Sequence, residues 1–436
     1  MNRREMLTLA GAALLAPVKA IAAEVKPVRI KSIENFPIEI PASPTEVEAG
    51  VMNRMSVTRV TTESGVRGYS FGNGGGAGRG GAGAGRGGGG AGGGGGRAGA
   101  PPAVPGRVGT PGGTPVPSPV SFAQMRDILI GADLFAIEQH LQRGLIYQSG
   151  LEEAMWDTIG KVAGQPIHRL LGGSKTSVPV YITAVWPGPA DQSQVPIKDQ
   201  AVYARRLKDA GFTGFKMRIF RQNYMDDVDS CAGIIAACGP APGFKVMVDR
   251  TAHQPGWVWD YPTGLAASKA LQKVGVYWLE EPFARDDFDG PARLCREMDP
   301  FIITGGEGWK GLDPFREGLL KSTYDIFQPD LITCGGLFML RKIAALCEAF
   351  HKPCIGHGSF GLSVAGRIQA HAAWGAPLEE FALARPPLLP QEQWAPALKI
   401  LNQKELYTFK NGEVQVPQGP GLGLDFNEEA IDRFKV

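Results

Sequence analysis

The sequence predicts an α/β protein in which a parallel β-barrel is joined to a smaller α+β domain. From Val178 onward, short apolar runs alternate with amphipathic helical stretches over about 200 residues, as in a barrel of repeated βα units. Polar residues close these apolar runs at intervals near the length of one βα unit. An open, doubly wound sheet is the alternative, but no GxGxxG motif follows a first strand.

Length, composition and charge set the outer limits. The chain has 436 residues, of which 43% are apolar, so it can bury a large core and exceeds one average domain. The formal net charge of +2 gives no overall attraction to nucleic acid or to membranes. No apolar run reaches the roughly 18 residues that span a bilayer. We therefore expect no nucleic-acid partner and no stable membrane span.

Residues 1–22 have the pattern of an export signal. Arg3 and Arg4 precede an apolar stretch over residues 6–18, and Ala20-Ile21-Ala22 forms a cleavage pattern. Adjacent arginines favour the twin-arginine pathway and hence a periplasmic location; an amphipathic first helix is the alternative. None of the six cysteines forms a CxxC pair, so we expect buried thiols.

Residues 23–175 are predicted to form the α+β domain. The stretches 28–40 and 55–72 alternate like antiparallel strands, with Ser64-Gly65 at a hairpin turn. The stretch 125–173 has helical periodicity and stops at Gly172-Gly173.

A glycine-rich insertion interrupts this domain at about residues 72–117. Between Gly72 and Ala100, 19 of 29 residues are glycine, and a proline-rich stretch follows. Such a segment buries too little apolar surface to offset its ordering entropy, so we expect disorder. The alternative is an RNA-binding segment built on Arg79, Arg86, Arg97 and Arg107. No aromatic residue stands between these arginines to stack on bases, which argues against it.

Residues 176–400 are predicted to form the barrel. The strand candidates are residues 178–183, 212–220, 244–249, 276–281, 301–307, 324–330 and 352–358. The amphipathic helix candidates are residues 201–211, 264–275 and 337–351.

Each predicted strand from the second onward ends in a residue that can carry chemistry. These residues are Lys216, Arg218, Asp249, Glu280, Glu307, Asp330 and His357. Successive strands place them 23 to 33 residues apart, near the roughly 30 residues of one βα unit. The spacing therefore puts them at one mouth of the barrel, where barrel enzymes keep their active sites.

Carboxylates that converge at this mouth need a cation between them. All-oxygen ligation selects Mg²⁺, and Mn²⁺ is the alternative. We expect Glu280 to be a metal ligand. Glu281 points to the other side of the strand, so it should pair with a cation or support a ligand.

Over nearly the whole chain after the signal, the sequence resembles the enolase superfamily, in particular the mandelate racemase and muconate lactonizing enzyme group. The motifs VMVD, WLEEP, TGGE, QPDLITCGG and IGHGS occur in the family's order. Residues 149–173 resemble the family's helical signature before the barrel, and residues 414–434 its C-terminal return. The resemblance implies a (β/α)₇β TIM-like barrel that is capped by the α+β domain of residues 23–175. It also implies that residues 401–436 return to this capping domain.

The same resemblance implies roles for the residues at the mouth. Asp249, Glu280 and Glu307 would bind Mg²⁺, and Asp330 would orient His357 as the base of a dyad. Enzymes of this superfamily use a Lys or His base with Mg²⁺ that stabilises an enediolate. Removing a proton next to a carboxylate needs this neutralisation, because a second negative charge develops.

The chain departs from the family pattern where two lysines usually stand, because it has Lys216-Met217-Arg218. The second lysine is normally the base on the opposite face, and a guanidinium stays protonated, so Arg218 argues against racemisation. Thr251 stands where the family often has asparagine. Glu380, or else its neighbour Glu379, is expected to contact the substrate carboxylate.

We therefore predict an Mg²⁺-dependent lyase, a dehydratase of a sugar acid or other hydroxy-carboxylate, that acts as a homo-oligomer. His357 would remove the α-proton, and Lys216 with Mg²⁺ would hold the enediolate. A racemase or epimerase is the alternative within the superfamily. A non-catalytic periplasmic protein that binds acidic sugars is an alternative of another class. A metal hydrolase is less favoured, because no HxH or HExxH motif occurs. His253 is ambiguous, and the other histidines are expected to be structural.

Overall fold

The computed structural model describes residues 26–73, 117–185, 196–251, 257–358 and 361–436. The predicted export signal, most of the predicted glycine-rich insertion and His253 lie outside these residues. Within them, no helix combines the length and the apolarity needed to cross a membrane.

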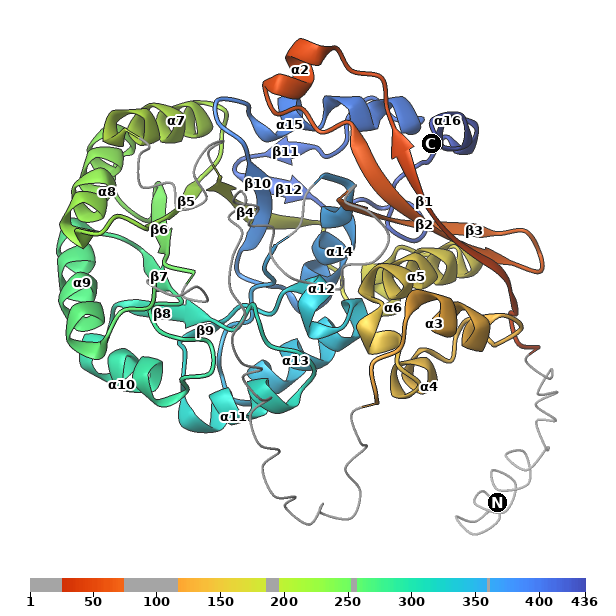
Figure 1. The fold of residues 1–436 in the computed structure, drawn as a ribbon, viewed down its shortest axis with the longest axis horizontal. Helices are drawn as coiled ribbons and strands as arrows, with labels where there is room; N and C mark the ends of the chain where they lie inside the picture. Colours follow the sequence, from red (N-terminus) through yellow and green to blue (C-terminus); the bar gives the residue numbers. More distant parts are fainter. Residues whose placement is uncertain (1–25, 74–116, 186–195, 252–256, 359–360) are drawn as a thin grey trace, which may run out of the picture.

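The N-terminal part is a three-stranded antiparallel sheet covered by helices (Figure 1). Its strands are β1 (Ile30–Glu39), β2 (Arg54–Thr62) and β3 (Arg67–Asn73). Its helices are α2 (Pro44–Glu48), α3 (Phe122–Leu129), α4 (Ile137–Gln142), η1 (Leu145–Tyr147), α5 (Ser149–Ala163) and α6 (Ile167–Leu170). Helix α5 is buried along most of its length, and Gly68 of β3 lets it approach, because a Cβ there would meet Thr158 at 2.2 Å. The Asp157 carboxylate also accepts a hydrogen bond from Tyr69 N.

Seven parallel strands follow in one sheet, in the order β10-β4-β5-β6-β7-β8-β9. Their bounds are β4 (Ser177–Ala184), β5 (Gly214–Arg218), β6 (Lys245–Asp249), β7 (Trp278–Glu280), β8 (Ile302–Gly305), β9 (Ile326–Phe327) and β10 (Glu379–Ala384). The segment around Cys354 and His357 continues this sheet beside β9 through two parallel bridges. The chain thus provides eight barrel positions, and the predicted fold class is confirmed.

Helices lie outside the sheet, each between successive strands (Figure 1). They are α7 (Ile197–Asp209), α8 (Tyr224–Cys238), α9 (Tyr261–Val274), α10 (Asp289–Met298), α11 (Asp313–Lys321), α12 (Leu331–Cys334), α13 (Leu337–Ala349), η2 (Gly361–Ser363) and α14 (Val364–Trp374). Local signals set their ends: Asp260 caps the first turn of α9 by accepting from Thr263 N, and Gly275 ends the helix in a left-handed conformation. The three predicted barrel helices correspond to α7, α9 and α13.

The C-terminal segment first extends the barrel sheet and then reaches the N-terminal sheet. Its elements are α15 (Pro390–Gln393), η3 (Ala395–Ile400), β11 (Phe409–Lys410), β12 (Glu413–Gln415) and α16 (Glu428–Arg433). Strand β12 pairs antiparallel with β4. Beyond it, Asp432 forms an ion pair with Arg59 of β2, and Lys435 bridges to Ile38 of β1.

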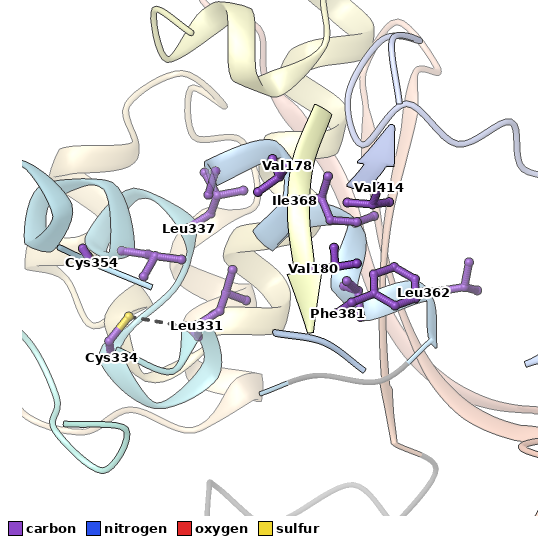
Figure 2. Close-up of a cluster of buried hydrophobic side chains, with 14 of the residues drawn as sticks. Val178, Val180, Leu331, Cys334, Leu337, Cys354, Leu362, Ile368, Phe381 and Val414 are labelled. Atoms are coloured by element: carbon purple, nitrogen blue, oxygen red, sulfur yellow. Dashed lines mark hydrogen bonds between the residues drawn. The ribbon is translucent and has the colours of Figure 1, made fainter. Parts of the chain in front are cut away.

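Alternation along the barrel strands separates an outer core from the lumen. Val178 and Val180 of β4 face outward and pack with Phe381 of β10, Ile368 of α14 and Val414 of β12 (Figure 2). The alternate residue Tyr181 belongs to a separate buried cluster with Met247, Trp278, Ile326, Ile355 and Leu378. All six cysteines are buried and free, as the sequence predicted.

One arginine closes the seam between the His357 segment and β10. The structure describes no backbone ladder between these two stretches. Instead, Arg367 of α14, which is fully buried, donates from Nη1 to the His357 carbonyl at 3.0 Å and from Nη2 to the Glu380 carbonyl. Its Nε donates to Glu379 at 2.6 Å. The guanidinium therefore replaces a strand pairing where two barrel strands meet.

Candidate active site

Strand register brings the predicted site residues to one end of the lumen. In the parallel sheet Lys216 pairs with Met247, Arg218 with Asp249, and Asp249 with Glu280. The Ile355 and His357 amides donate to the Phe327 and Pro329 carbonyls, which sets His357 beside Asp330. Because strand ends in a parallel barrel meet at one rim, these side chains share the C-terminal mouth.

Lys216 is sealed between two carboxylates. Its Nζ lies 2.7 Å from a Glu280 oxygen and 3.1 Å from a Glu380 oxygen, and all three side chains are fully buried. Burial alone lowers the pKa of Lys216, but the two carboxylates outweigh it and hold this pKa well above its ordinary value. Lys216 is therefore a fixed positive charge rather than a proton acceptor.

Glu280 and Glu380 differ in how their charge is supported. Burial raises the pKa of Glu280, and Lys216 offsets this only in part. Burial also acts to raise the pKa of Glu380, but Lys216, His357 and Arg367 lower it below its ordinary value. Glu380 also accepts hydrogen bonds from the Thr183 hydroxyl and, at 2.7 Å, from Gly358 N. Glu380 thus stays ionised, whereas Glu280 carries a charge that the protein alone compensates poorly.

His357 and Asp330 form the predicted dyad geometry. His357 Nδ1 lies 3.2 Å from Asp330 Oδ2, while Asp330 Oδ1 accepts from the amides of Ile332 and Thr333 at the start of α12. The opposite ring nitrogen, Nε2, lies 2.5 Å from Glu307 and 3.6 Å from Glu380. Burial lowers the pKa of His357, but the Glu380 charge and the Asp330 contact together raise it above its ordinary value. The contacts with Glu307 and Glu380 show that Nε2 faces the mouth.

Asp249 stands one strand away from Glu280. Its Oδ1 accepts from Thr251 N at 2.6 Å, and its Oδ2 lies 3.7 Å from Arg218 Nε. Thr251 has a φ of +47°, in the left-handed region that β-branched residues disfavour and asparagine tolerates. The threonine at this position therefore strains the turn that directs a backbone N–H at Asp249.

Arg285 connects the two acids that flank Glu280 in the structure. Its Nε lies 2.8 Å from Glu281, and its Nη2 contacts Glu307. Burial raises the pKa of Glu281 to about 7, although Arg285 opposes this shift. As the sequence predicted, Glu281 pairs with a cation instead of facing the lumen.

The donor set fits a divalent cation. Asp249 Oδ2 and Glu280 Oε1 are buried and have no hydrogen-bond partner among the described residues. Glu307 Oε2 likewise has only its ion-pair contact with His357. Unpartnered buried carboxylate oxygens are costly unless a cation binds them. Ligand atoms of Glu280, Glu307 and His357 lie within 4.8 Å of one another, whereas Asp249 lies outside this group.

A family model described as "Enolase C-terminal domain-like" matches residues 199–430, more than half of the chain. The chain belongs to the enolase superfamily. Within it, the chain resembles the mandelate racemase and muconate lactonizing enzyme group.

Relatives of this enolase-superfamily chain act on sugar acids. An arabinonate dehydratase of Saccharolobus solfataricus is 30% identical over 66% of this chain and 71% of its own length. A 3,6-anhydro-alpha-L-galactonate cycloisomerase of Streptomyces coelicolor is 28% identical over 72% and 82%. The crystal structure of L-talarate dehydratase from Polaromonas sp. JS666, complexed with Mg and L-glucarate, shares the fold with a TM-score of 0.64. It is 20% identical over 93% of this chain and 97% of that chain.

Sequence reasoning about this enolase-superfamily chain left one register open and missed several supporting residues. The structure places Glu380 in the site, while Glu379 points away and contacts Arg367 and His371 of α14. Arg285, Gln328 and Thr183 were not predicted, although Gln328 donates to Glu280 at 3.1 Å and Thr183 to Glu380. Alternation could have found the last two, since Gln328 lies two residues before Asp330, and Thr183 ends the first strand.

Proposed function

We propose that this protein is an Mg²⁺-dependent lyase that dehydrates a sugar acid or another hydroxy-carboxylate. The observation that carries the proposal is that the described residues place one base at the mouth: His357 is oriented by Asp330, whereas Lys216 is locked between Glu280 and Glu380. The dehydratases among the relatives support the same reaction class. Their enzymatic names also favour catalysis over the alternative of a binding protein without activity.

Asp249, Glu280 and Glu307 would hold the cation, since among the described residues one buried oxygen of Asp249 and one of Glu280 have no hydrogen-bond partner, and Glu307 Oε2 has only its ion-pair contact with His357. Arg218 and His357, which contact Asp249 and Glu307 here, would then lose those contacts to the ion. A bound Mg²⁺ supplies Lewis-acid neutralisation of the charge that develops on the substrate carboxylate. Mn²⁺ suits the same oxygen ligands.

His357 Nε2 takes the proton from the α-carbon of the substrate. The electron pair of that C–H bond moves toward the carboxylate to give an enediolate, and then forms the double bond to the β-carbon as the β C–O bond breaks. The departing hydroxide takes a proton, which the new imidazolium can return, and leaves as water. The enol that remains tautomerises to a 2-keto-3-deoxy acid. Lys216 contributes a fixed positive charge near the reacting carboxylate, and Asp330 stabilises the imidazolium.

A racemase or epimerase of the same superfamily needs a second proton-transfer group on the opposite face. Arg218, at the position of the family's second lysine, carries a guanidinium, which is a poor proton acceptor compared with a lysine amine. This residue favours elimination over inversion of the stereocentre.

A cycloisomerase is the second candidate, because this chain matches a relative named as a cycloisomerase about as well as one named as a dehydratase. Elimination from a cyclic acid breaks a ring C–O bond, so the leaving oxygen stays attached to the product. The product mass separates the two reactions, because dehydration loses one water and ring opening loses none.

The test is to incubate the enzyme and Mg²⁺ with a library of acid sugars in D₂O. We expect a semicarbazide-reactive keto acid that lacks one water and carries solvent deuterium at C3. Two epimers exchanging deuterium at the α-carbon, with no keto acid, would refute dehydration. A keto acid that has lost no water would identify a cycloisomerase.

Export by the twin-arginine pathway and assembly into a homo-oligomer remain predictions. Fusing residues 1–22 to a reporter that is active only after export tests the first. Light scattering of the purified chain tests the second.

A further inference from the structure

We infer that the barrel has a second small-molecule site, in the lumen at the end opposite the active site, which takes a small aromatic monocarboxylate. A pocket of about 290 Å³ lies there. Its lining includes Lys245, Tyr277, Trp278, Ile302, Asp325 and Leu378. The inference does not depend on which reaction the mouth catalyses.

Strand register places this pocket inside the barrel. Side chains two residues apart face the same side of a sheet, and on three strands a lining residue stands two or four positions before a mouth residue. Lys245 precedes Asp249, Trp278 precedes Glu280, and Leu378 precedes Glu380 in this way. The pocket residues are therefore the first lumen-facing residues of strands whose last lumen-facing residues form the active site.

The pocket has the size and surface of a binding site for a flat apolar group. Its volume is roughly twice that of an engineered apolar cavity of about 150 Å³ that binds benzene. Trp278, Ile326, Ile355 and Leu378 are buried, while Lys245, Tyr277 and Ile302 at the opening are partly exposed. Trp278 is fully buried, yet its Nε1–H has no hydrogen-bond partner among the described residues. A buried donor without a partner is costly.

The charge at the opening selects an anion. Asp325 is already occupied, because Oδ2 accepts from Ile303 N at 3.0 Å and Oδ1 lies 3.5 Å from Lys352 Nζ. The described contact of the Lys245 ammonium is with the Tyr277 ring, 5.8 Å away, and no carboxylate is paired with it in the described part of the chain. One positive charge beside two aromatic rings matches a ligand with a carboxylate and an aromatic body.

A packed layer separates the two sites. Tyr181, Met247 and Trp278 are fully buried between them, and Tyr181 meets Trp278 edge to face with centroids 5.3 Å apart. The Lys216 ammonium lies 5.7 Å above the Tyr181 ring on the active-site side. A ligand in the pocket would thus contact the layer that supports Lys216 without entering the mouth.

The test uses 4-fluorobenzoate as the probe and follows its ¹⁹F signal on titration into the full-length protein, with Mg²⁺ and then with excess EDTA. We expect saturable binding that persists in EDTA and is at least tenfold tighter than that of neutral 4-fluorobenzyl alcohol. Lys245→Met should weaken binding at least tenfold and leave turnover unchanged. Ile302→Trp, which fills the opening of the pocket, should abolish binding of the probe.

Lys198→Met is the matched control, because it removes the same charge from an exposed position on α7 outside the pocket. It should bind the probe like the wild type. Equal binding by Lys245→Met, equal binding of the neutral probe, or loss of binding in EDTA would each overturn the inference. So would no saturation of the wild type up to millimolar probe.

Discussion

The two ends of the barrel lumen are built from the same strands but have opposite chemistry. At the C-terminal ends, Lys216, Glu280 and Glu380 are fully buried charges that contact one another. At the N-terminal ends, the corresponding positions hold Trp278 and Leu378, two residues earlier on the same strands. The apolar end stabilises the fold by burial, whereas each buried charge at the mouth costs desolvation energy and persists only with its partners. Substitutions should therefore affect activity at one end and stability at the other.

The largest effect should come from the base. His357→Asn removes the proton acceptor, so we expect kcat to fall by about 10³-fold, with the free energy of unfolding nearly unchanged. Asp330→Asn keeps the ring but loosens its tautomer and orientation, so a loss of about 10- to 100-fold is expected. Steady-state kinetics of keto-acid formation measures both losses. Full activity of His357→Asn would show that another residue is the base.

The next test compares one substitution at each end of the lumen. Trp278→Ala should lower the free energy of unfolding by about 3–5 kcal/mol, because it empties a packed position in the lumen. Glu280→Gln, two residues further on the same strand, should change it by no more than about 1 kcal/mol while abolishing turnover, since Lys216 keeps its contact with Glu380. Urea unfolding gives both values. A severe loss of stability in Glu280→Gln would contradict the proposal that the mouth serves activity and the apolar end serves stability.

A divalent cation should stabilise the protein by binding at the mouth, so the gain should depend on residues of the mouth and not on the apolar end of the lumen. At a concentration about 100-fold above Kd, Mg²⁺ should add about 3 kcal/mol to the free energy of unfolding. This gain should disappear in Glu280→Gln and persist in Trp278→Leu. The thermal midpoint, measured with Mg²⁺ and with EDTA, reports the difference. An Mg²⁺ effect that survives in Asp249→Asn, Glu280→Gln and Glu307→Gln alike would place the ion elsewhere.

The smallest effect should come from the seam arginine. Arg367→Lys keeps the positive charge but cannot reach the His357 and Glu380 carbonyls together, so we expect kcat to fall about tenfold with KM little changed. Arg367→Met should also lower the free energy of unfolding more than Arg367→Lys does, because it leaves Glu379 buried without the cation of residue 367. Wild-type kcat in Arg367→Lys would exclude positioning of the dyad strand by the guanidinium.

Much of the mouth could be predicted from the sequence, because parallel strands end at one rim. The interval of roughly one βα unit between Asp249, Glu280 and Glu307 was enough to predict their shared location, and the motifs added the dyad of Asp330 and His357. The alternation within a strand also predicted that Glu281 would leave the lumen and pair with a cation.

Other features were decided only by tertiary structure. In Leu378-Glu379-Glu380-Phe381, either phase gives each face one apolar residue and one acid, so local pattern could not choose between the glutamates. Packing of Phe381 against the outer core and of Leu378 in the lumen makes the choice and turns Glu380 to the site. Likewise, Arg367 joins two strands through contacts between residues that no sequence period relates. The sequence by itself determined which strand ends carry chemistry, because that depends on chain spacing. The tertiary structure decided which atoms meet, because that depends on side chains from different strands competing for one buried space.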